Sequence, residues 1–270
     1  MIHVIKADRR HEPFSESKVM DSIRRARIPQ SLQGSVLTHV KSKIYDGIST
    51  AEIYQHILEF LDQSPKPFVK ARYSLKEAIM LLGPSGYPFE DFVAKLLESQ
   101  GYQTQVRQIL SGRCVTHEID VLAEKDGRTA VIETKFHNSP GTRSEIQVAL
   151  YTHARFNDVK VRNSVHESWI ITNTKTTVDA NSYAHCSGMK IISWDYPAGN
   201  SLREMIERSG LHPITMVTSL APSHKMTLLE NHVVLCRDIA ENPELLDMLY
   251  LGRADRERVL EEVNALSSTE

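Results

Sequence analysis

A glutamate and a lysine interrupt a stretch that otherwise reads as a buried strand. The segment VIETKFHN, residues 131–138, is rich in apolar and β-branched residues but carries Glu133 and Lys135 two positions apart. Because side chains alternate in direction along a strand, we expect both charges on one face of the sheet. A buried ionised group costs several kcal/mol unless it is paired or binds a ligand. The spacing therefore points to a site for a charged ligand.

The preceding strand offers further acids beside this one. The segment HEIDVLAE, residues 117–124, is joined to it by Asp126-Gly127, a typical hairpin turn. Strict alternation places Glu118 and Asp120 on a common face and the apolar residues between and after them on the reverse. Carboxylate oxygens from adjacent strands suit a hard divalent cation such as Mg²⁺ or Mn²⁺. A lysine close by can orient the water that such a cation acidifies.

Strands and helices alternate around this hairpin, which predicts an α/β sheet with helices on its faces. Expected strands lie at 103–110, 117–124, 129–137, 167–172 and 190–194. Expected helices run from Pro88 to a cap at Gly101, over 144–156 and over 178–186.

Two turn-rich stretches, 82–88 and 196–200, divide the chain into predicted domains at 1–84, 85–198 and 199–270. The first is mainly helical, with one strand at 3–6 and helices at 15–27, 35–45, 50–63 and 69–82. The last shows no strand signal, and prolines separate its helices.

The bulk composition excludes several classes of protein. The 270 residues are 41% apolar, which is ordinary for a folded chain, and a formal charge of -2 provides no global basic excess for nucleic acid. The three cysteines lie far apart, as in proteins with reduced thiols. No apolar run approaches the roughly 20 residues of a membrane span. We expect a cytoplasmic protein without membrane contact, in which any DNA contact comes from local patches.

The acids and the lysine of the hairpin occur in a known order. Asp120 followed by Glu133-Thr134-Lys135 resembles the PD-(D/E)xK nuclease superfamily, with Ile119 where a proline often stands. The resemblance implies that Asp120 and Glu133 bind the metal and that Lys135 is the partner of the attacking water. It implies hydrolysis of a phosphodiester, one strand at a time, so that cutting a duplex favours a homodimer.

Two flanking helices extend the resemblance to the group related to Mrr restriction endonucleases. YPFEDFVAKLLESQGY, residues 87–102, matches a helix that carries an additional acid, here Glu90, and Gln147 with Tyr151 matches the helix after the Glu-x-Lys strand. The resemblance implies an outer supporting role for Glu90 and a catalytic role for Gln147. Each also has an ordinary reading, as an acid favoured by the helix dipole and as a surface glutamine. Glu118 is either a second acid of the metal face or a plain hairpin residue.

The N-terminal segment VIKADRRHEPFSESKV, residues 4–19, resembles the opening of the ATP-cone, a nucleotide-sensing domain, and ARYSLKEAI at 71–79 matches its closing helix. The resemblance implies ATP or dATP as a regulatory ligand, since no Walker-type loop for consuming it is present. The alternative is a retained helical fold without nucleotide. Arg9 stands where the family usually has glycine, which alone adopts positive φ readily. The predicted contact residues are Val4, Lys6, Arg9, Arg10 and Lys18.

The whole chain is thus expected to be a Mg²⁺-dependent DNA endonuclease of restriction or defence type, regulated by ATP or dATP. The rival is a non-hydrolytic, nucleotide-sensing DNA-binding regulator, in which the nuclease fold serves only as a clamp. A structural oligomerisation scaffold would make no use of the charges. The C-terminal helices, 199–270, resemble tandem helix-hairpin-helix elements faintly, and plain packing or dimerisation is an equal reading.

Overall fold

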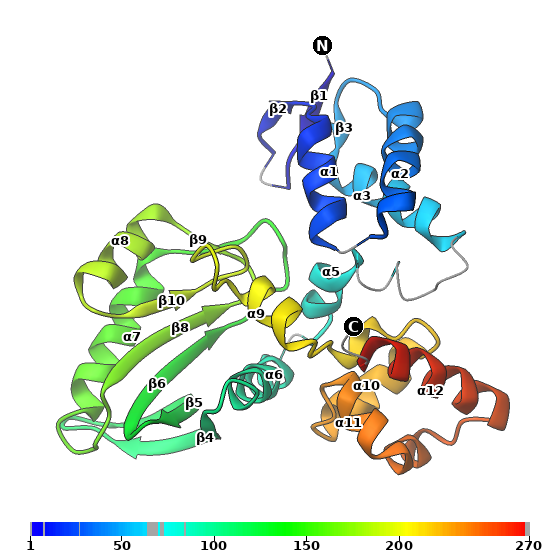
Figure 1. Cartoon of the computed structure of the whole chain (residues 1–270). Coiled ribbons are helices and arrows are strands. Elements are labelled where there is room, and N and C mark those ends of the chain that lie inside the picture. The colour runs from blue at the N-terminus through cyan, green and yellow to red at the C-terminus, as the bar shows by residue number, and fades with distance from the viewer. Residues whose placement is uncertain are drawn as a thin grey trace.

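The computed structural model describes residues 2–7, 9–26, 28–63, 70, 73–83 and 85–267. It shows an N-terminal unit, a central sheet flanked by helices and a C-terminal group of helices (Figure 1). The predicted fold class is confirmed: an α/β core stands between a mainly helical unit and an all-helical one. Asp8, Arg27, Val69, Ala71, Arg72 and Pro84, which the sequence analysis used, lie outside the described residues. Within these ranges, no helix is both long and apolar enough to cross a bilayer.

The N-terminal unit combines a small sheet with three helices around its own core. Strand β1 (His3–Ile5) pairs antiparallel with β2 (His11–Pro13) and parallel with β3 (Ile48–Ser49). The helices are α1 (Glu16–Arg25), α2 (Gln30–Lys43) and α3 (Thr50–Asp62). Ser49 and Glu52 form a capping box that starts α3 where the sequence predicts it. Helix α2 begins five residues before the predicted 35–45 segment. The short helix α5 (Leu75–Met80) then leads to the core.

The central sheet has the strand order β10-β8-β6-β5-β4. Strands β4 (Gln103–Ser111), β5 (Thr116–Lys125) and β6 (Arg128–Lys135) form an antiparallel meander. Strands β8 (Glu167–Thr172) and β10 (Lys190–Ile192) continue it in parallel with β6. A minor pair, β7 (Arg143–Ser144) and β9 (Lys175–Thr176), was not predicted, because two-residue strands carry no periodic pattern.

Helices cover both faces of this sheet. Helix α6 (Tyr87–Glu98) packs on the face that carries Val121 and Ile132. Helices α7 (Ile146–Val159) and α8 (Val178–Cys186) cover the other face, where Val131 and Ile170 lie. Figure 1 shows α6 on one side and α7 with α8 on the other. Strand β6 carries its acid on the α7 side, so α7 is the helix that faces the candidate site.

Strand β5 does not alternate regularly along its length. Ile119 packs with Val131 and Val159 on the α7 side, whereas Val121 packs with Ile132 on the α6 side. The expectation that Ile119 and Val121 share the reverse face is therefore wrong. In the facing strand β4, Arg107 lies opposite the position between them, and its backbone adopts the left-handed conformation with a φ of 54°. The regular alternation of β5 is thus interrupted at Asp120.

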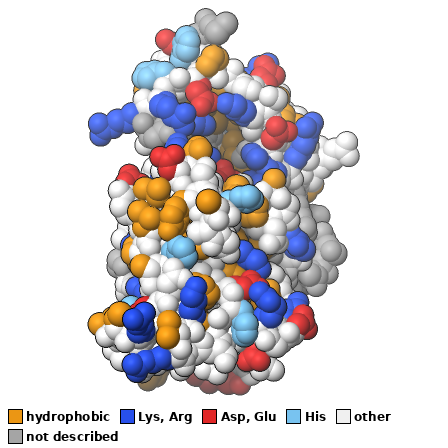
Figure 2. Space-filling view, turned by 90° about the vertical axis from the view of Figure 1, so that its left-hand side faces the viewer, with side chains coloured by type: hydrophobic (Ala, Val, Ile, Leu, Met, Phe, Trp, Pro, Cys, Tyr) orange, Lys and Arg blue, Asp and Glu red, His pale blue; other side chains and the backbone are white. Residues whose placement is uncertain are grey.

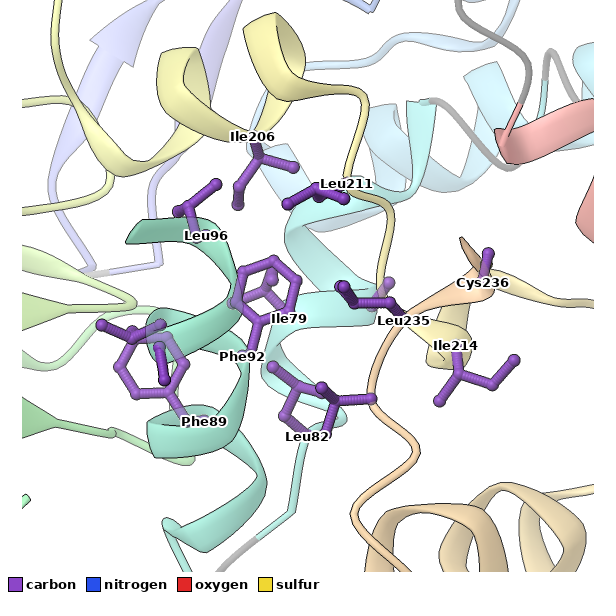
Figure 3. Close-up of a cluster of buried hydrophobic side chains, with 14 of the residues drawn as sticks. Ile79, Leu82, Phe89, Phe92, Leu96, Ile206, Leu211, Ile214, Leu235 and Cys236 are labelled. Atoms are coloured by element: carbon purple, nitrogen blue, oxygen red, sulfur yellow. The ribbon is translucent and has the colours of Figure 1, made fainter. Parts of the chain in front are cut away.

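The C-terminal helices share their hydrophobic core with α6. They are α9 (Leu202–Ser209), α10 (Pro222–Glu230), α11 (Cys236–Glu241) and α12 (Arg253–Ser267), with 3₁₀ turns at Ile214–Met216 and Pro243–Leu249. Figure 3 shows Phe92 and Leu96 of α6 beside Ile206 and Leu211, with Leu235 across from them. Helix α6 is thus buried between the sheet and the C-terminal helices.

Truncation of a buried α6 side chain should destabilise this shared core. Leu96 is 1% exposed, and Leu96→Ala should lower the free energy of unfolding by about 3–5 kcal/mol because it leaves a cavity. The matched control is Leu150→Ala on α7, where the side chain is 44% exposed and the loss should stay below about 1 kcal/mol. Urea unfolding followed by circular dichroism measures both. Equal losses would contradict the assignment of α6 to the shared core.

Candidate active site

The two predicted metal ligands meet where β5 and β6 separate. The ladder between these strands runs from Lys125↔Arg128 to Val121↔Ile132. At the next position the Asp120 carboxylate accepts the Thr134 backbone N–H at 2.7 Å and its hydroxyl at 3.1 Å, both on Oδ2. A side chain thus takes the place of a main-chain partner, while β6 continues its pairing with β8. Asp120 is fixed at the opening of the strands, beside Glu133.

Helix α7 holds the carboxylate of Glu133. The Tyr151 hydroxyl donates to Oε1, and Arg155 Nη1 donates to Oε2 at 2.5 Å. Tyr151 and Arg155 lie one helical turn apart, and the guanidinium stands over the phenol ring, 5.5 Å from its centroid. Glu133 is only 8% exposed. Its orientation is therefore set by two side chains of one helix.

The buried carboxylates of Asp120 and Glu133 are difficult to ionise together, even with Arg155 and Lys135 nearby. Burial raises the pKa of Asp120, and burial together with the negative charge of Asp120 raises the pKa of Glu133. Arg155 and Lys135 act in the opposite direction on the Glu133 pKa, but burial outweighs them. Two carboxylates that are costly to ionise side by side are a place where a further cation is stabilising.

Glu90 adds a third acid from the first turn of α6. Arg107 bridges it and its neighbour, with Nη1 3.0 Å from Glu90 Oε2 and Nη2 2.7 Å from Asp91 Oδ1. Burial raises the pKa of Glu90 to about 7, and the charge of Asp120 adds to this, so the ion pair with Arg107 only partly offsets the desolvation. Asp91 also pairs with His232 at 2.8 Å, which ties the acid-bearing turn to the C-terminal helices.

The other predicted site residues, Lys135, Gln147 and Glu118, lie on β6, α7 and β5. Lys135 lies at the end of β6, two positions after Glu133 and half-buried, and its charge lowers the Glu133 pKa. Gln147 lies exposed in the first turn of α7, one turn before Tyr151. Glu118 is exposed on β5, and its carbonyl accepts a 3.4 Å hydrogen bond from Arg155. The structure thus brings Asp120, Glu133 and Lys135 to one end of the hairpin; the catalytic roles of all five site residues stay predictions.

The donor set fits a hard divalent cation only in part as it stands. Asp120 and Glu133 supply the carboxylate oxygens that Mg²⁺ or Mn²⁺ prefers, and such ions take their other ligands from water and phosphate. Among the described residues, however, no group of three or more His, Cys, Asp or Glu side chains converges as a metal cluster. Arg155 occupies Glu133 Oε2. Together with Tyr151 on Oε1, this contact leaves one lone pair on each Glu133 oxygen for a cation.

Three of the predicted nucleotide contacts line one cavity of the N-terminal unit. Val4, Lys6 and Lys18 border a cavity of about 320 Å³ between the β1–β2 hairpin, α1 and α3. Glu12 pairs there with Lys18 at 2.6 Å and with Lys6 at 3.9 Å. Arg10 lines a separate cavity. Arg9 has a φ of 63°, so the arginine at the glycine position of the turn does adopt the left-handed conformation.

Sequence reasoning missed the residues that hold the acids in place. Arg155 follows Tyr151 by four positions and Gln147 by eight, so helical periodicity could have found it on the same face. The backbone N–H of Thr134 gives no such signal, because its partner depends on where two strands part. Asn173 follows β8 and is 36 residues away from His137 along the chain. Its side chain accepts the His137 backbone N–H at 2.8 Å and donates to the His137 carbonyl at 2.9 Å. It ends β6 at Lys135, two residues before the predicted end.

Comparisons with known proteins agree with this arrangement. Family models match the ATP cone domain at residues 2–78, the Mrr-type restriction endonuclease at 82–205 and the AF1548-like C-terminal domain at 212–267. An uncharacterized protein of Archaeoglobus fulgidus is 40% identical over 152 residues, which are 56% of this chain and 86% of that protein. The crystal structure of a protein of unknown function, AF1548, matches with a TM-score of 0.59 and 36% identity, over 67% of this chain and 97% of the other.

Fold, site and comparisons define a protein with a restriction endonuclease domain of the PD-(D/E)xK superfamily, preceded by an ATP-cone domain. More particularly, the chain belongs to the same family as the Archaeoglobus fulgidus relative, and its residues 212–267 match the AF1548-like C-terminal domain. The faint resemblance of the C-terminal helices to helix-hairpin-helix elements stays a prediction.

The high pKa of Glu90 should make stability depend on pH. The folded-state pKa of about 7 exceeds the ordinary 4.5, so the folded chain keeps a proton that the unfolded chain releases. This contribution is complete below pH 4.5 and is lost as the pH rises to about 7, by about 3 kcal/mol at most. Glu90→Gln should abolish this part of the decline in urea unfolding measured between these pH values.

The matched control for this measurement is Glu98→Gln, which changes an exposed acid at the other end of α6 and should keep the parent's pH profile. Identical profiles for the parent and Glu90→Gln would show that Glu90 titrates normally.

Proposed function

We propose that this protein is a divalent-cation-dependent DNA endonuclease that hydrolyses phosphodiester bonds and is regulated by ATP or dATP at its cone domain. The observation that carries the proposal is the convergence of Asp120, Glu133 and Lys135 at the point where β5 and β6 part. The restriction endonuclease domain implies DNA as the substrate. Restriction or defence is the biological setting that the Mrr-like domain favours.

Each residue has a chemical role in this proposal. Asp120 and Glu133 would hold Mg²⁺ or Mn²⁺, which when bound polarises the phosphate and acidifies water. Lys135 orients the attacking water and offsets the charge of the scissile phosphate. Glu90 supports the acids from the outer side, and Gln147 lies on the helix that faces them. Because burial raises the pKa values of Asp120 and Glu133, cation binding displaces protons and should weaken as the pH falls.

A non-hydrolytic, nucleotide-sensing DNA-binding regulator is the second candidate. The observation that favours it is the 2.5 Å ion pair between Arg155 and Glu133, which neutralises one of the two acids. In that case the restriction endonuclease domain would bind DNA without cutting it. Intact Asp120, Glu133 and Lys135 favour the enzyme, since a clamp has no use for this set.

Substitution of the lysine should separate these two functions. With plasmid DNA and Mg²⁺ or Mn²⁺, Lys135→Ala should lower the nicking rate at least about 100-fold while DNA binding in EDTA changes little. Asp120→Asn should abolish nicking and also weaken cation binding measured by calorimetry. Lys160→Ala, an exposed lysine after α7, is the matched control and should nick like the parent. DNA binding by a parent that nicks no substrate, with either cation, would instead support the regulator.

Nucleotide binding should depend on the lysines of the 320 Å³ cavity. The double variant Lys6→Ala, Lys18→Ala should bind ATP at least about tenfold more weakly, because two cations that line the cavity are lost. Lys43→Ala is the control, since Lys43 is exposed at the end of α2 and does not line the cavity. Calorimetric titration with ATP and dATP measures the affinities. Unchanged affinity in the double variant would place the nucleotide elsewhere.

We further infer a cytoplasmic homodimer. One active site cuts one strand, so two copies are needed to sever a duplex in one encounter. Light scattering of the full chain, alone and with duplex DNA, tests the oligomeric state.

A further inference from the structure

A second cationic cavity lies at the border between the cone domain and the nuclease domain. It measures about 140 Å³, and its lining comes from both sides. Lys6 and Arg10 come from the β1–β2 hairpin, and Arg143 and Lys175 come from the nuclease domain. Figure 1 shows the loop between β6 and α7 reaching up toward the hairpin, and Figure 2 shows Lys and Arg side chains gathered in the upper part of that face. We call this cavity the seam.

The seam is held together by local structure on each side. Arg143 and Lys175 are Cα partners in the small β7–β9 sheet, so main-chain pairing places the two residues side by side, and the Lys175 ammonium also pairs with Asp195 at 2.7 Å. On the border itself, a Cβ at Gly141 would stand 3.0 Å from the Ala7 carbonyl oxygen and 3.4 Å from its carbon. A side chain at 141 would therefore require the Ala7 backbone to shift by a few tenths of an ångström. Glycine at this position lets the two chain segments approach closely.

Two larger cavities adjoin the seam. One of about 520 Å³ shares Ala7 and Pro140 with it and is lined by the aromatic rings of Tyr54, Tyr73 and Trp194. Tyr54 and Tyr73 stack with their centroids 5.2 Å apart. The other is the 320 Å³ cavity, which shares Lys6 with the seam. Together they offer cations for phosphate groups and flat rings for a base, which are the two halves of a nucleotide.

Hydrogen bonds connect the seam to the catalytic strand. Ser144 follows Arg143, and its hydroxyl lies 2.9 Å from His137 Nε2 and 3.4 Å from the Thr172 hydroxyl. Thr172 in turn donates to the Lys135 carbonyl at 2.7 Å. The cationic lining is therefore one residue away from a polar chain that ends on the backbone of Lys135.

A second connection runs from the end of the cone domain to the same place. Lys76 of α5 lines the 520 Å³ cavity, stands 4.4 Å from the Trp194 ring centroid and donates to the Asn173 carbonyl. The Asn173 side chain clamps both backbone groups of His137. The cone domain and β6 are thus connected on two sides of the loop that follows β6.

We propose that the seam binds the phosphate groups of a nucleoside triphosphate and that Arg143 and Lys175 of the nuclease domain complete this subsite. Occupancy then fixes the loop after β6 and, through Ser144, the position of Lys135. The regulatory half of this inference rests on the proposed nuclease function, whereas the binding half does not. DNA phosphate shares the same chemistry, but the small volume between two domains and the adjoining aromatic cavity favour a nucleotide.

The binding half is tested with the full chain by calorimetric titration with ATP and with inorganic triphosphate. The double variant Arg143→Ala, Lys175→Ala should bind both at least about tenfold more weakly than the parent. The matched control, Lys160→Ala with Arg162→Ala, removes two exposed cations of the same domain and should bind like the parent. The charge-preserving pair Arg143→Lys, Lys175→Arg should retain most of the affinity, which separates loss of charge from misfolding. Unchanged ATP affinity in the alanine pair, together with weaker binding of a short DNA duplex, would overturn the inference in favour of a DNA contact.

The coupling half is tested with Ser144→Ala, which leaves the cations in place. This variant should bind ATP like the parent but lose the effect of ATP on nicking. Hydrogen exchange over residues 136–144 provides a readout that needs no cleavage: ATP should slow it in the parent and much less in Ser144→Ala. If the parent never nicks DNA but ATP still slows its hydrogen exchange, the nuclease proposal is refuted and nucleotide binding at the seam is supported. ATP binding without any change in exchange or nicking would overturn the coupling.

Discussion

The Asp120 carboxylate holds the parting strands of the central hairpin in place. Its hydrogen bonds to Thr134 satisfy a backbone N–H that the antiparallel ladder leaves without its usual partner. If β5 and β6 stayed paired to their ends, the carboxylates would lie along a flat ladder instead of around an opening. If they parted without this bond, a half-buried amide would lose its acceptor at a cost of about 1–3 kcal/mol. One side chain thus secures the geometry that the candidate site needs.

Cationic side chains around the opening pair with the acids and orient them. Arg155 and Tyr151 orient Glu133 from α7, while Arg107 bridges Glu90 and Asp91 from β4. The two groups stand on opposite faces of the sheet, so the acids are held between helix α7 on one side and helix α6 on the other. Burial still raises the pKa values of the acids, which leaves the site poised for a positively charged ligand.

Patterns that depend on near neighbours could be read from the sequence. The apolar stripe of α6, the Asp126-Gly127 turn and the spacing of Glu133 and Lys135 all led to the right elements. What depends on distant contacts could not be read: the face change between Ile119 and Val121 reflects a distortion shared with β4. The partners of Glu133 and Asp120 likewise come from packing between elements, for which spacing along one strand gives no signal.

The division of the hydrophobic core has a consequence for how the chain can be inherited. The part of the cone domain before α5 buries its own set of apolar residues, including Val36 and Ile57, whereas Leu75, Ala78 and Ile79 of α5 belong to the core shared with α6. Helix α6 buries its stripe jointly against the sheet and the C-terminal helices, so neither of those parts encloses a complete interior alone. Gene fusion or loss could add or remove the part of the cone before α5 and leave a foldable remainder. The nuclease domain and the C-terminal domain should instead be gained or lost together during evolution.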